Sequence, residues 1–191
     1  MLQILLLDNY DSFTFNIVQI INELQIGKLS LFANDQIDLE EVKKYDKILL
    51  SPGAGIPSEA GIMNTLINAY AAQKSILGIC LGHQAIAETQ GAQLLNLPKV
   101  YHGQKVKITL SQPQDYLFAQ LPPEIEVGLY HSWAVKPETL PKTLQPTAYS
   151  TIDNILMAIA HQHYDLRGVQ FHPESYMTSQ GTQIIKNWLK Y

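Results

Sequence analysis

The chain has 191 residues, of which 46% are hydrophobic and 16% charged, and a formal net charge of −4 at pH 7. This composition is typical of a compact globular protein and argues against a surface for nucleic acid or anionic membranes. A single cysteine excludes an internal disulfide and fits a reducing compartment. The first apolar run stops at Asp8 and has no basic segment before it, so it predicts neither a signal peptide nor a membrane span. We expect one cytoplasmic domain over residues 1–191.

Strands and helices alternate through the first ninety residues. Short apolar runs predict buried strands at residues 4–7 and 75–79, and further strands are predicted at residues 29–32 and 47–50. Helical spacing of apolar side chains predicts helices at residues 13–24, 39–45, 59–73 and 85–89. We expect Asp11 or Ser12 to cap the first of these helices and Gly27 to end it. Such alternation predicts a parallel sheet covered by helices, with functional sites at the carboxyl ends of its strands.

The pattern changes after residue 105. Short runs separated by turns that contain Pro and Gly predict strands at residues 106–110, 126–130, 147–151, 155–160 and 168–171. A final amphipathic helix is predicted at residues 178–189. The fold class that we expect is therefore α/β: an open, mainly parallel sheet with helices on both faces and an antiparallel extension.

Cys80 is a candidate catalytic residue because it lies where a predicted strand turns into a helix. Gly78 and Gly82 flank it at −2 and +2, which is the spacing of a nucleophile elbow with Cys in place of Ser. The start of the helix would favour the thiolate and offer free N–H groups to an oxyanion. The alternative is a buried free cysteine, which is the usual fate of a lone Cys.

A thiolate nucleophile needs a base and a group that orients that base. His172 ends an apolar strand, Pro173 stops the strand's hydrogen bonding, and Glu174 follows directly. Glu174 could hold the second ring nitrogen of His172 as the third member of a triad does, although His-Pro-Glu is also ordinary turn chemistry. His83 lies three residues after Cys80, and we expect it to point away from the thiol and to serve in packing.

The other four histidines give weaker indications. His161 and His163 alternate along a predicted strand and would face one side, but no acidic or Cys ligand stands near them in sequence. We therefore expect no metal site there. His102 and His131 lie in turns, where each could belong to a site loop or could simply be a satisfied polar residue.

A glycine-rich loop at residues 51–57 follows the predicted strand at 47–50. Gly53 and Gly55 let its backbone approach a ligand closely, so its N–H groups are candidate donors to an oxyanion or a substrate. No Lys-Ser/Thr pair follows, which excludes a phosphate-binding P-loop.

Three stretches together resemble the class I, triad-type, glutamine amidotransferases: Gly-Ile-Cys-Leu-Gly-His-Gln at 78–84, Ser-Pro-Gly-Ala-Gly at 51–55 and Phe-His-Pro-Glu-Ser at 171–175. The resemblance runs the whole length of the chain. Within the family it is most similar to the glutaminase subunits of anthranilate synthase and aminodeoxychorismate synthase. The segments that point there are Asp-Asn-Tyr-Asp-Ser-Phe at 8–13, Pro-Ser-Glu-Ala-Gly at 57–61, Val-Tyr-His-Gly at 100–103 and Tyr-His-Ser at 130–132.

The resemblance implies a flavodoxin-like fold and a role for each matching residue. Cys80 would attack the side-chain amide of glutamine, and His172, oriented by Glu174, would take the thiol proton and protonate the departing ammonia. The N–H groups of Leu81 and Gly53 would form the oxyanion hole. Other positions match those that hold glutamine, the last two of them through backbone groups: Gly55, Gln84, Ser132 and Trp133. Ala54 stands where the family usually has Pro, and Trp133 where many relatives have a smaller apolar residue.

The resemblance also implies a partner. A chorismate-binding synthase subunit would use the ammonia, either component I of anthranilate synthase in tryptophan biosynthesis or component I of aminodeoxychorismate synthase in folate biosynthesis; some subunits serve both. It implies no cofactor or metal in this chain, and no nucleic-acid or membrane partner. Two other readings compete: a Cys peptidase or chaperone on a related fold, against which Glu174 argues, and a silent regulatory subunit, which would normally have lost Cys80 or His172.

Overall fold

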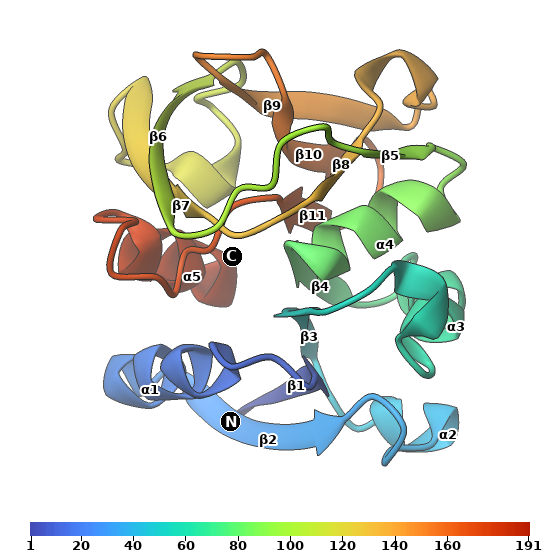
Figure 1. The fold of residues 1–191 in the computed structure, drawn as a ribbon. Coiled ribbons are helices and arrows are strands. Elements are labelled where there is room, and N and C mark those ends of the chain that lie inside the picture. Colours follow the sequence, from blue (N-terminus) through green and yellow to red (C-terminus); the bar gives the residue numbers. More distant parts are fainter.

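The computed structural model describes residues 1–191, which form a nine-stranded mixed sheet with helices on both faces (Figure 1). The strand order is β2-β1-β3-β4-β11-β10-β9-β6-β7, and a separate two-stranded sheet pairs β5 with β8. This arrangement confirms the expected α/β fold class with an antiparallel extension.

The first half of the sheet is parallel. Its strands are β1 (Leu2–Asn9), β2 (Gly27–Ala33), β3 (Lys47–Gly53) and β4 (Ser75–Ile79), joined by the helices α1 (Thr14–Leu24), α2 (Leu39–Val42) and α3 (Met63–Tyr70). Helix α4 (Leu81–Thr89) follows β4 directly. Parallel neighbours need crossovers of this kind, which the four helices supply.

The second half is antiparallel except where it joins the first. It contains β6 (Gln104–Leu110), β7 (Glu124–Leu129), β9 (Leu144–Ser150), β10 (Leu156–His161) and β11 (Leu166–Val169). Strand β11 pairs antiparallel with β10 but parallel with β4, so it extends the parallel half by one strand. The short strands β5 (Leu94–Asn96) and β8 (Trp133–Val135) pair beside α4, and α5 (Gly181–Lys190) ends the chain.

Two hydrophobic layers enclose the sheet, because successive side chains of a buried strand point to opposite faces. In β1, Ile4 and Leu6 join the layer that contains α1 and α5, whereas Leu5 and Leu7 join the layer that contains α3 and α4. Figure 1 shows the same division, with α1 and α5 on one side of the sheet and α2, α3 and α4 on the other. Trp188 of α5 is fully buried in the first layer.

Several local predictions were wrong. Gln25, not Gly27, adopts the left-handed conformation that ends α1 (φ 53°), and Gly27 begins β2. Asp11 does act at the start of α1, since its Oδ1 accepts the Phe13 N–H at 2.8 Å, although the N-cap residue Phe13 itself makes no side-chain capping bond. The helix expected at residues 59–73 begins only at Met63, after a 3₁₀ turn at Pro57–Glu59. The two strands of the small sheet were missed because each has only three residues, too few for a periodic pattern.

A search of the helices for one with the length and apolar character needed to cross a bilayer finds none.

Candidate active site

Cys80 occupies a strained elbow between β4 and α4. Its backbone has φ 50° and ψ −97°, outside the regions that non-glycine residues ordinarily adopt. The flanking glycines are required by contact: a Cβ on Gly78 would lie 2.4 Å from the backbone carbon and oxygen of Gly82. A Cβ on Gly82 would lie 2.7 Å from the Cβ and carbonyl oxygen of Leu50 in β3. The strand and the helix therefore meet backbone to backbone, as the spacing around Cys80 predicted.

His172 and Glu174 form a buried pair just beyond β11. The His172 Nδ1 and the Glu174 Oε1 lie 2.6 Å apart, and both side chains are almost fully enclosed. The backbone holds the pair in place, since the His172 N–H donates to the Gly128 carbonyl and the Thr178 hydroxyl donates to the His172 carbonyl. This pairing fixes Nδ1, so only Nε2 remains for a reacting group.

The pKa of His172 lies well above its ordinary value. Burial works against the charged ring, but attraction to Cys80 and Glu174 outweighs it. A thiol and an imidazole that influence each other in this way have the electrostatics of a nucleophile and its base.

Most of the predicted binding residues line one small cavity of about 130 Å³. Its walls are Gly53, Ala54, Gly55, Cys80, Gln84, Tyr130, His131, Ser132 and Trp133. Segments from β3, α4 and the loop before β8 thus meet at the Cys80 thiol. Leu81 does not line this cavity, but its side chain packs against Gly53, where an added Cβ would lie 2.7 Å from the Leu81 Cδ2. The two residues that are expected to supply the oxyanion donors are therefore in contact through the Leu81 side chain.

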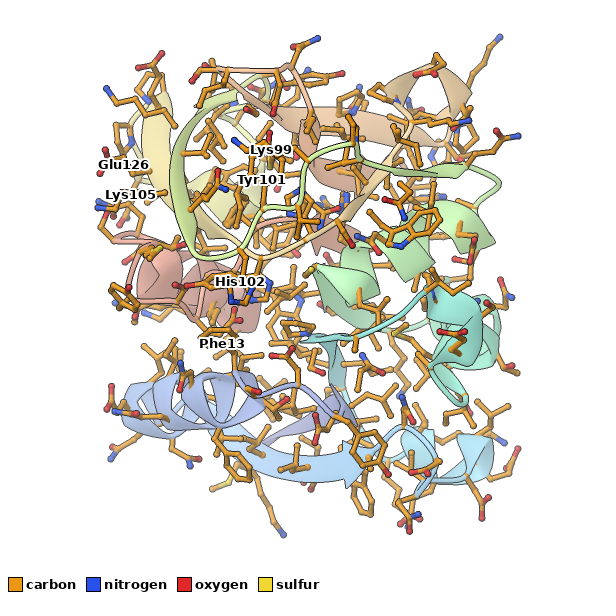
Figure 2. The ribbon with its side chains drawn as sticks, in the orientation of Figure 1. Phe13, Lys99, Tyr101, His102, Lys105 and Glu126 are labelled. Atoms are coloured by element: carbon orange, nitrogen blue, oxygen red, sulfur yellow. The ribbon has the colours of Figure 1, made fainter.

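A second cavity of about 260 Å³ reaches Cys80 from another side. It shares Gly53, Ala54, Cys80 and Tyr130 with the first and adds Asp11, Ser12, Phe13, Pro52, His102 and His172. The Tyr130 ring contacts the rings of Phe13 and His172, with centroids 4.9 and 4.8 Å away. In Figure 2, Phe13 and His102 lie near each other at this cavity. The loop after β1 therefore opens beside Cys80.

Asn9 ties the loop after β1 to the glycine-rich loop after β3. Its N–H donates to the Ser51 hydroxyl and its side-chain amide to the Ser51 carbonyl, each at 2.8 Å. The Asn34 amide donates in turn to the Asn9 Oδ1 at 3.0 Å. Gly53 lies directly on this network, because an added Cβ would be 2.7 Å from the Asn9 Cβ. Sequence reasoning missed Asn9 and Asn34, since a buried asparagine network has no spacing signature.

Gln170 is a third residue that sequence reasoning missed. It is fully buried, and its Nε2 donates to the Cys80 Sγ at 3.5 Å. Its Oε1 accepts from the Gln84 Nε2 at 3.1 Å, and that same nitrogen donates to the Trp133 carbonyl at 2.8 Å. A signal was present, because Gln170 precedes His172 by two residues, and alternate residues of an extended segment share a face.

Of the remaining histidines, His83 lies outside the two cavities and His131 lines the first. His83 is fully buried against Gly168, outside both cavities, and burial lowers its pKa to about 3, which suits a packing residue. His131 lines the first cavity and stacks on Tyr101; burial, then repulsion from His172, lowers its pKa to about 4.

The prediction that His161 and His163 alternate along one strand was wrong. His161 ends β10 and His163 follows in a turn, so they do not alternate along one strand. Instead, the His161 Nδ1 accepts the N–H groups of His163 and Tyr164, and its ring stacks on Tyr164. No group of three or more His, Cys, Asp or Glu residues has the arrangement of a metal site.

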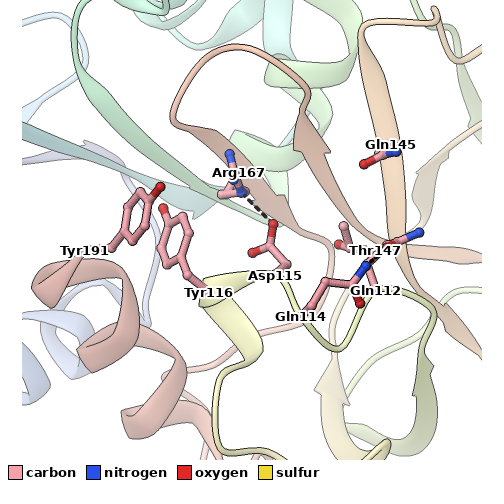
Figure 3. Close-up of a pocket in the computed structure, with 8 residues that line it drawn as sticks. All are labelled: Gln112, Gln114, Asp115, Tyr116, Gln145, Thr147, Arg167 and Tyr191. Atoms are coloured by element: carbon pink, nitrogen blue, oxygen red, sulfur yellow. Dashed lines mark hydrogen bonds and ion pairs between the residues drawn. The ribbon is translucent and has the colours of Figure 1, made fainter.

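A polar pocket of about 290 Å³ lies elsewhere, toward the other end of β11 (Figure 3). Arg167 donates to Asp115 at 3.0 Å and also lies near Asp165, while Tyr191 stacks on Tyr116. None of the predicted site residues lines it. Its charges neutralise one another, so this pocket has no free group comparable to the Cys80 thiol.

The comparisons with known proteins agree on one family. A family model described as glutamine amidotransferase class-I matches residues 5–191. The anthranilate synthase component 2 of Porphyra purpurea is 43% identical over 189 residues, which cover 97% of this chain and 98% of that protein. The aminodeoxychorismate synthase component 2 of Escherichia coli K12 is 43% identical over 188 residues, with 97% and 98% coverage. A solved structure from Thermoplasma acidophilum, described as a GMP synthase subunit, is similar with a TM-score of 0.88 at 29% identity, covering 100% of this chain and 93% of that one.

The chain therefore belongs to the class I glutamine amidotransferases. The family resemblance and the enzyme class predicted from the sequence are confirmed. Relatives with nearly the same length and identity are second components of two different synthases, one named for anthranilate and one for aminodeoxychorismate.

Proposed function

We propose that this chain is the glutaminase subunit of anthranilate synthase, which hydrolyses glutamine and supplies ammonia to a chorismate-binding partner in tryptophan biosynthesis. The proposal rests chiefly on one observation: Cys80, the His172–Glu174 pair and a cavity of about 130 Å³ lie together at the carboxyl ends of neighbouring strands. The 43% identity to an anthranilate synthase component 2 over nearly the whole length supports the choice of synthase.

In the proposed reaction, His172 takes the proton of the Cys80 thiol, and the thiolate attacks the amide carbon of glutamine. The carbonyl oxygen becomes an oxyanion that accepts hydrogen bonds from the N–H groups of Leu81 and Gly53. The carbon–nitrogen bond then breaks, His172 gives its proton to the leaving ammonia, and a glutamyl thioester remains on Cys80. Water, deprotonated by His172, hydrolyses the thioester and releases glutamate. Glu174 keeps the His172 ring in the orientation that both proton transfers need. No cofactor or metal in this chain takes part.

The hydrogen bonds that Gln84 already makes define how it would contact the substrate. Both N–H groups of its amide are used, one by the Trp133 carbonyl and one by Gln170. Only its Oε1 is free, so Gln84 would accept a hydrogen bond from the α-ammonium of glutamine. The Ser132 carbonyl also already has a hydrogen-bond partner, since it accepts the Leu97 N–H at 2.7 Å.

The partner would also control the glutaminase. Gly53 is the last residue of β3, and the loop that follows it has an alanine in place of a stiffening proline at position 54 and a positive φ of 77° at Gly55. A misplaced oxyanion donor costs roughly 3 kcal/mol, about 10²-fold in rate. We expect a docked synthase subunit to hold this loop, with the 1–3 kcal/mol coupling usual between sites. Glutamine turnover should therefore be low for the chain alone and should rise with the partner and again with chorismate; equal rates in all three would refute this regulation.

The alternative function is the glutaminase subunit of aminodeoxychorismate synthase, or of both synthases, because the identity to that component is equally high. The chain should be combined separately with each synthase subunit in the presence of glutamine and chorismate. The proposal is supported if product forms only with the anthranilate synthase subunit and that product is anthranilate. Aminodeoxychorismate alone would replace the proposal by the alternative, and both products would indicate a shared subunit.

A further inference from the structure

Cys80 and Gln170 leave the sheet side by side. The parallel register of β4 and β11 pairs Ile79 with Val169, and the Cys80 N–H donates to the Val169 carbonyl at 2.8 Å. The Gln170 N–H is fixed in turn by the Met157 carbonyl at 2.8 Å. The backbone on both sides is thus held by sheet hydrogen bonds, and the Gln170 side chain, with no exposed surface, remains beside the thiol.

The orientation of the Gln170 amide follows from a main-chain carbonyl. The Trp133 carbonyl can only accept, so Gln84 must present its NH₂ group there. The second hydrogen of that group points to Gln170, so Gln170 must accept it with its Oε1. The Gln170 NH₂ group is then directed at the Cys80 Sγ. Amide orientations are assigned from such networks, and here each step leaves one choice.

We propose that Gln170 supports the nucleophile by donating a hydrogen bond to the Cys80 thiolate while its oxygen holds Gln84 at the glutamine cavity. The proposal rests on the assignment of Cys80 as the nucleophile. A buried N–H facing a sulfur is better satisfied by the thiolate than by the thiol, because hydrogen bonds to a charged acceptor are stronger. The same amide keeps the sulfur and the substrate-binding Gln84 in a fixed relation, which favours reactive alignment.

Gln170 differs from the other groups near Cys80 because it does not titrate. The titratable side chains that line the two cavities at Cys80, or stand directly behind them, are Asp11, His102, Tyr130, His131, His172 and Glu174. Replacing Gln170 leaves all of these in place. A change in the pH dependence of Cys80 reactivity would therefore report on the donated hydrogen bond itself.

The test measures the rate at which iodoacetamide alkylates Cys80, the chain's only cysteine, as a function of pH, with the adduct followed by intact mass. Gln170→Met keeps the approximate volume, carries no charge at any pH and removes both hydrogen bonds. Gln170→Leu, the second variant, is also uncharged and removes the same two hydrogen bonds with a shorter, branched side chain. Thr147→Val, a buried polar residue on β9, is the matched control for loss of polarity in the sheet.

We expect the midpoint of the alkylation profile to move upward by about one pH unit or more in Gln170→Met, with roughly a tenfold lower rate at pH 7. Gln170→Leu should shift it in the same direction, and Thr147→Val should match the wild type. If Gln170 only fills space, the Gln170→Met profile coincides with the wild-type profile, and this result would overturn the proposal. If Gln170→Met does not fold, Gln170→Leu decides the matter by the same two outcomes.

Failure of the proposed function would be recognised separately. Alkylation reports on the thiol alone and needs neither glutamine nor a partner. If Cys80 were not the nucleophile, Cys80→Ser would leave glutamine use intact, whatever the alkylation profiles of the Gln170 variants show.

Discussion

Gly78→Ala tests whether the elbow geometry, rather than the mere presence of Cys80, determines activity. An alanine Cβ at 78 would lie 2.4 Å from backbone atoms of Gly82 and 2.7 Å from the His83 nitrogen. Cβ contacts essentially never fall below 3.0 Å, so the backbone of α4 must move by about 0.6 Å, the difference between the two distances. No flexible side chain can absorb this shift.

The first turn of α4 carries the Leu81 N–H, so the movement displaces the expected oxyanion donor together with Cys80. We expect Gly78→Ala to lose about 1–3 kcal/mol of unfolding free energy through overpacking. We also expect the glutaminase kcat/KM of the folded protein to fall by about 10²-fold, the usual cost of misplacing a donor or a nucleophile.

The assay compares glutamine-dependent with ammonia-dependent product formation by the purified complex, so that loss of the partner's own activity is recognised. Gly91→Ala is the control at the other end of α4, where an added Cβ meets nothing within 4 Å although φ is +103°. It should cost stability, about 1 kcal/mol, without a loss of kcat/KM. Wild-type kcat/KM in folded Gly78→Ala would refute the reasoning.

Four further variants test the roles of His172, Glu174 and His83. His172→Ala should lower the glutaminase rate on the order of 10²-fold or more, the scale of a lost general acid–base; a larger loss from His83→Ala would contradict the assignment. Glu174→Gln should cost less because the imidazole remains, and an NMR titration should show a lower pKa for His172, which the carboxylate now raises. For His83, the folded pKa of about 3 lies below the 6.5 of a free imidazole, so its neutral form contributes fully above pH 6.5 and stability falls as the pH drops toward 3. His83→Asn should flatten that slope by up to about 1.4 kcal/mol per pH unit in urea unfolding, whereas an unchanged slope would show that His83 does not carry it.

The parallel half of the fold could be predicted because most of its strands are apolar on both faces and its longer helices are amphipathic; β2, at the edge of the sheet, is only partly buried. The runs at β1, β3 and β4 are continuous, so their burial and their strand ends could be identified from the sequence alone. The nucleophile elbow was likewise visible, since Gly78 and Gly82 are needed by direct backbone contact.

What could not be predicted depends on tertiary contact. The end of α1 at Gln25 required a non-glycine residue in the left-handed conformation, which no local rule favours. The parallel pairing of β11 with β4 joins segments about ninety residues apart, and Gln170 meets Cys80 only through that register. Asn9 gains its role in the same way, from Ser51 on β3 and from Asn34 in the turn after β2.

The most direct test of the central claim is the complex that contains Cys80→Ser, assayed with chorismate and either glutamine or a high concentration of ammonium salt. We predict that glutamine no longer supports product formation and that ammonium restores it, because the chain's only task would be to release ammonia. A glutamine-like diazoketone should add mass to the wild-type chain at Cys80 alone. Glutamine use by Cys80→Ser at near the wild-type rate would contradict the account.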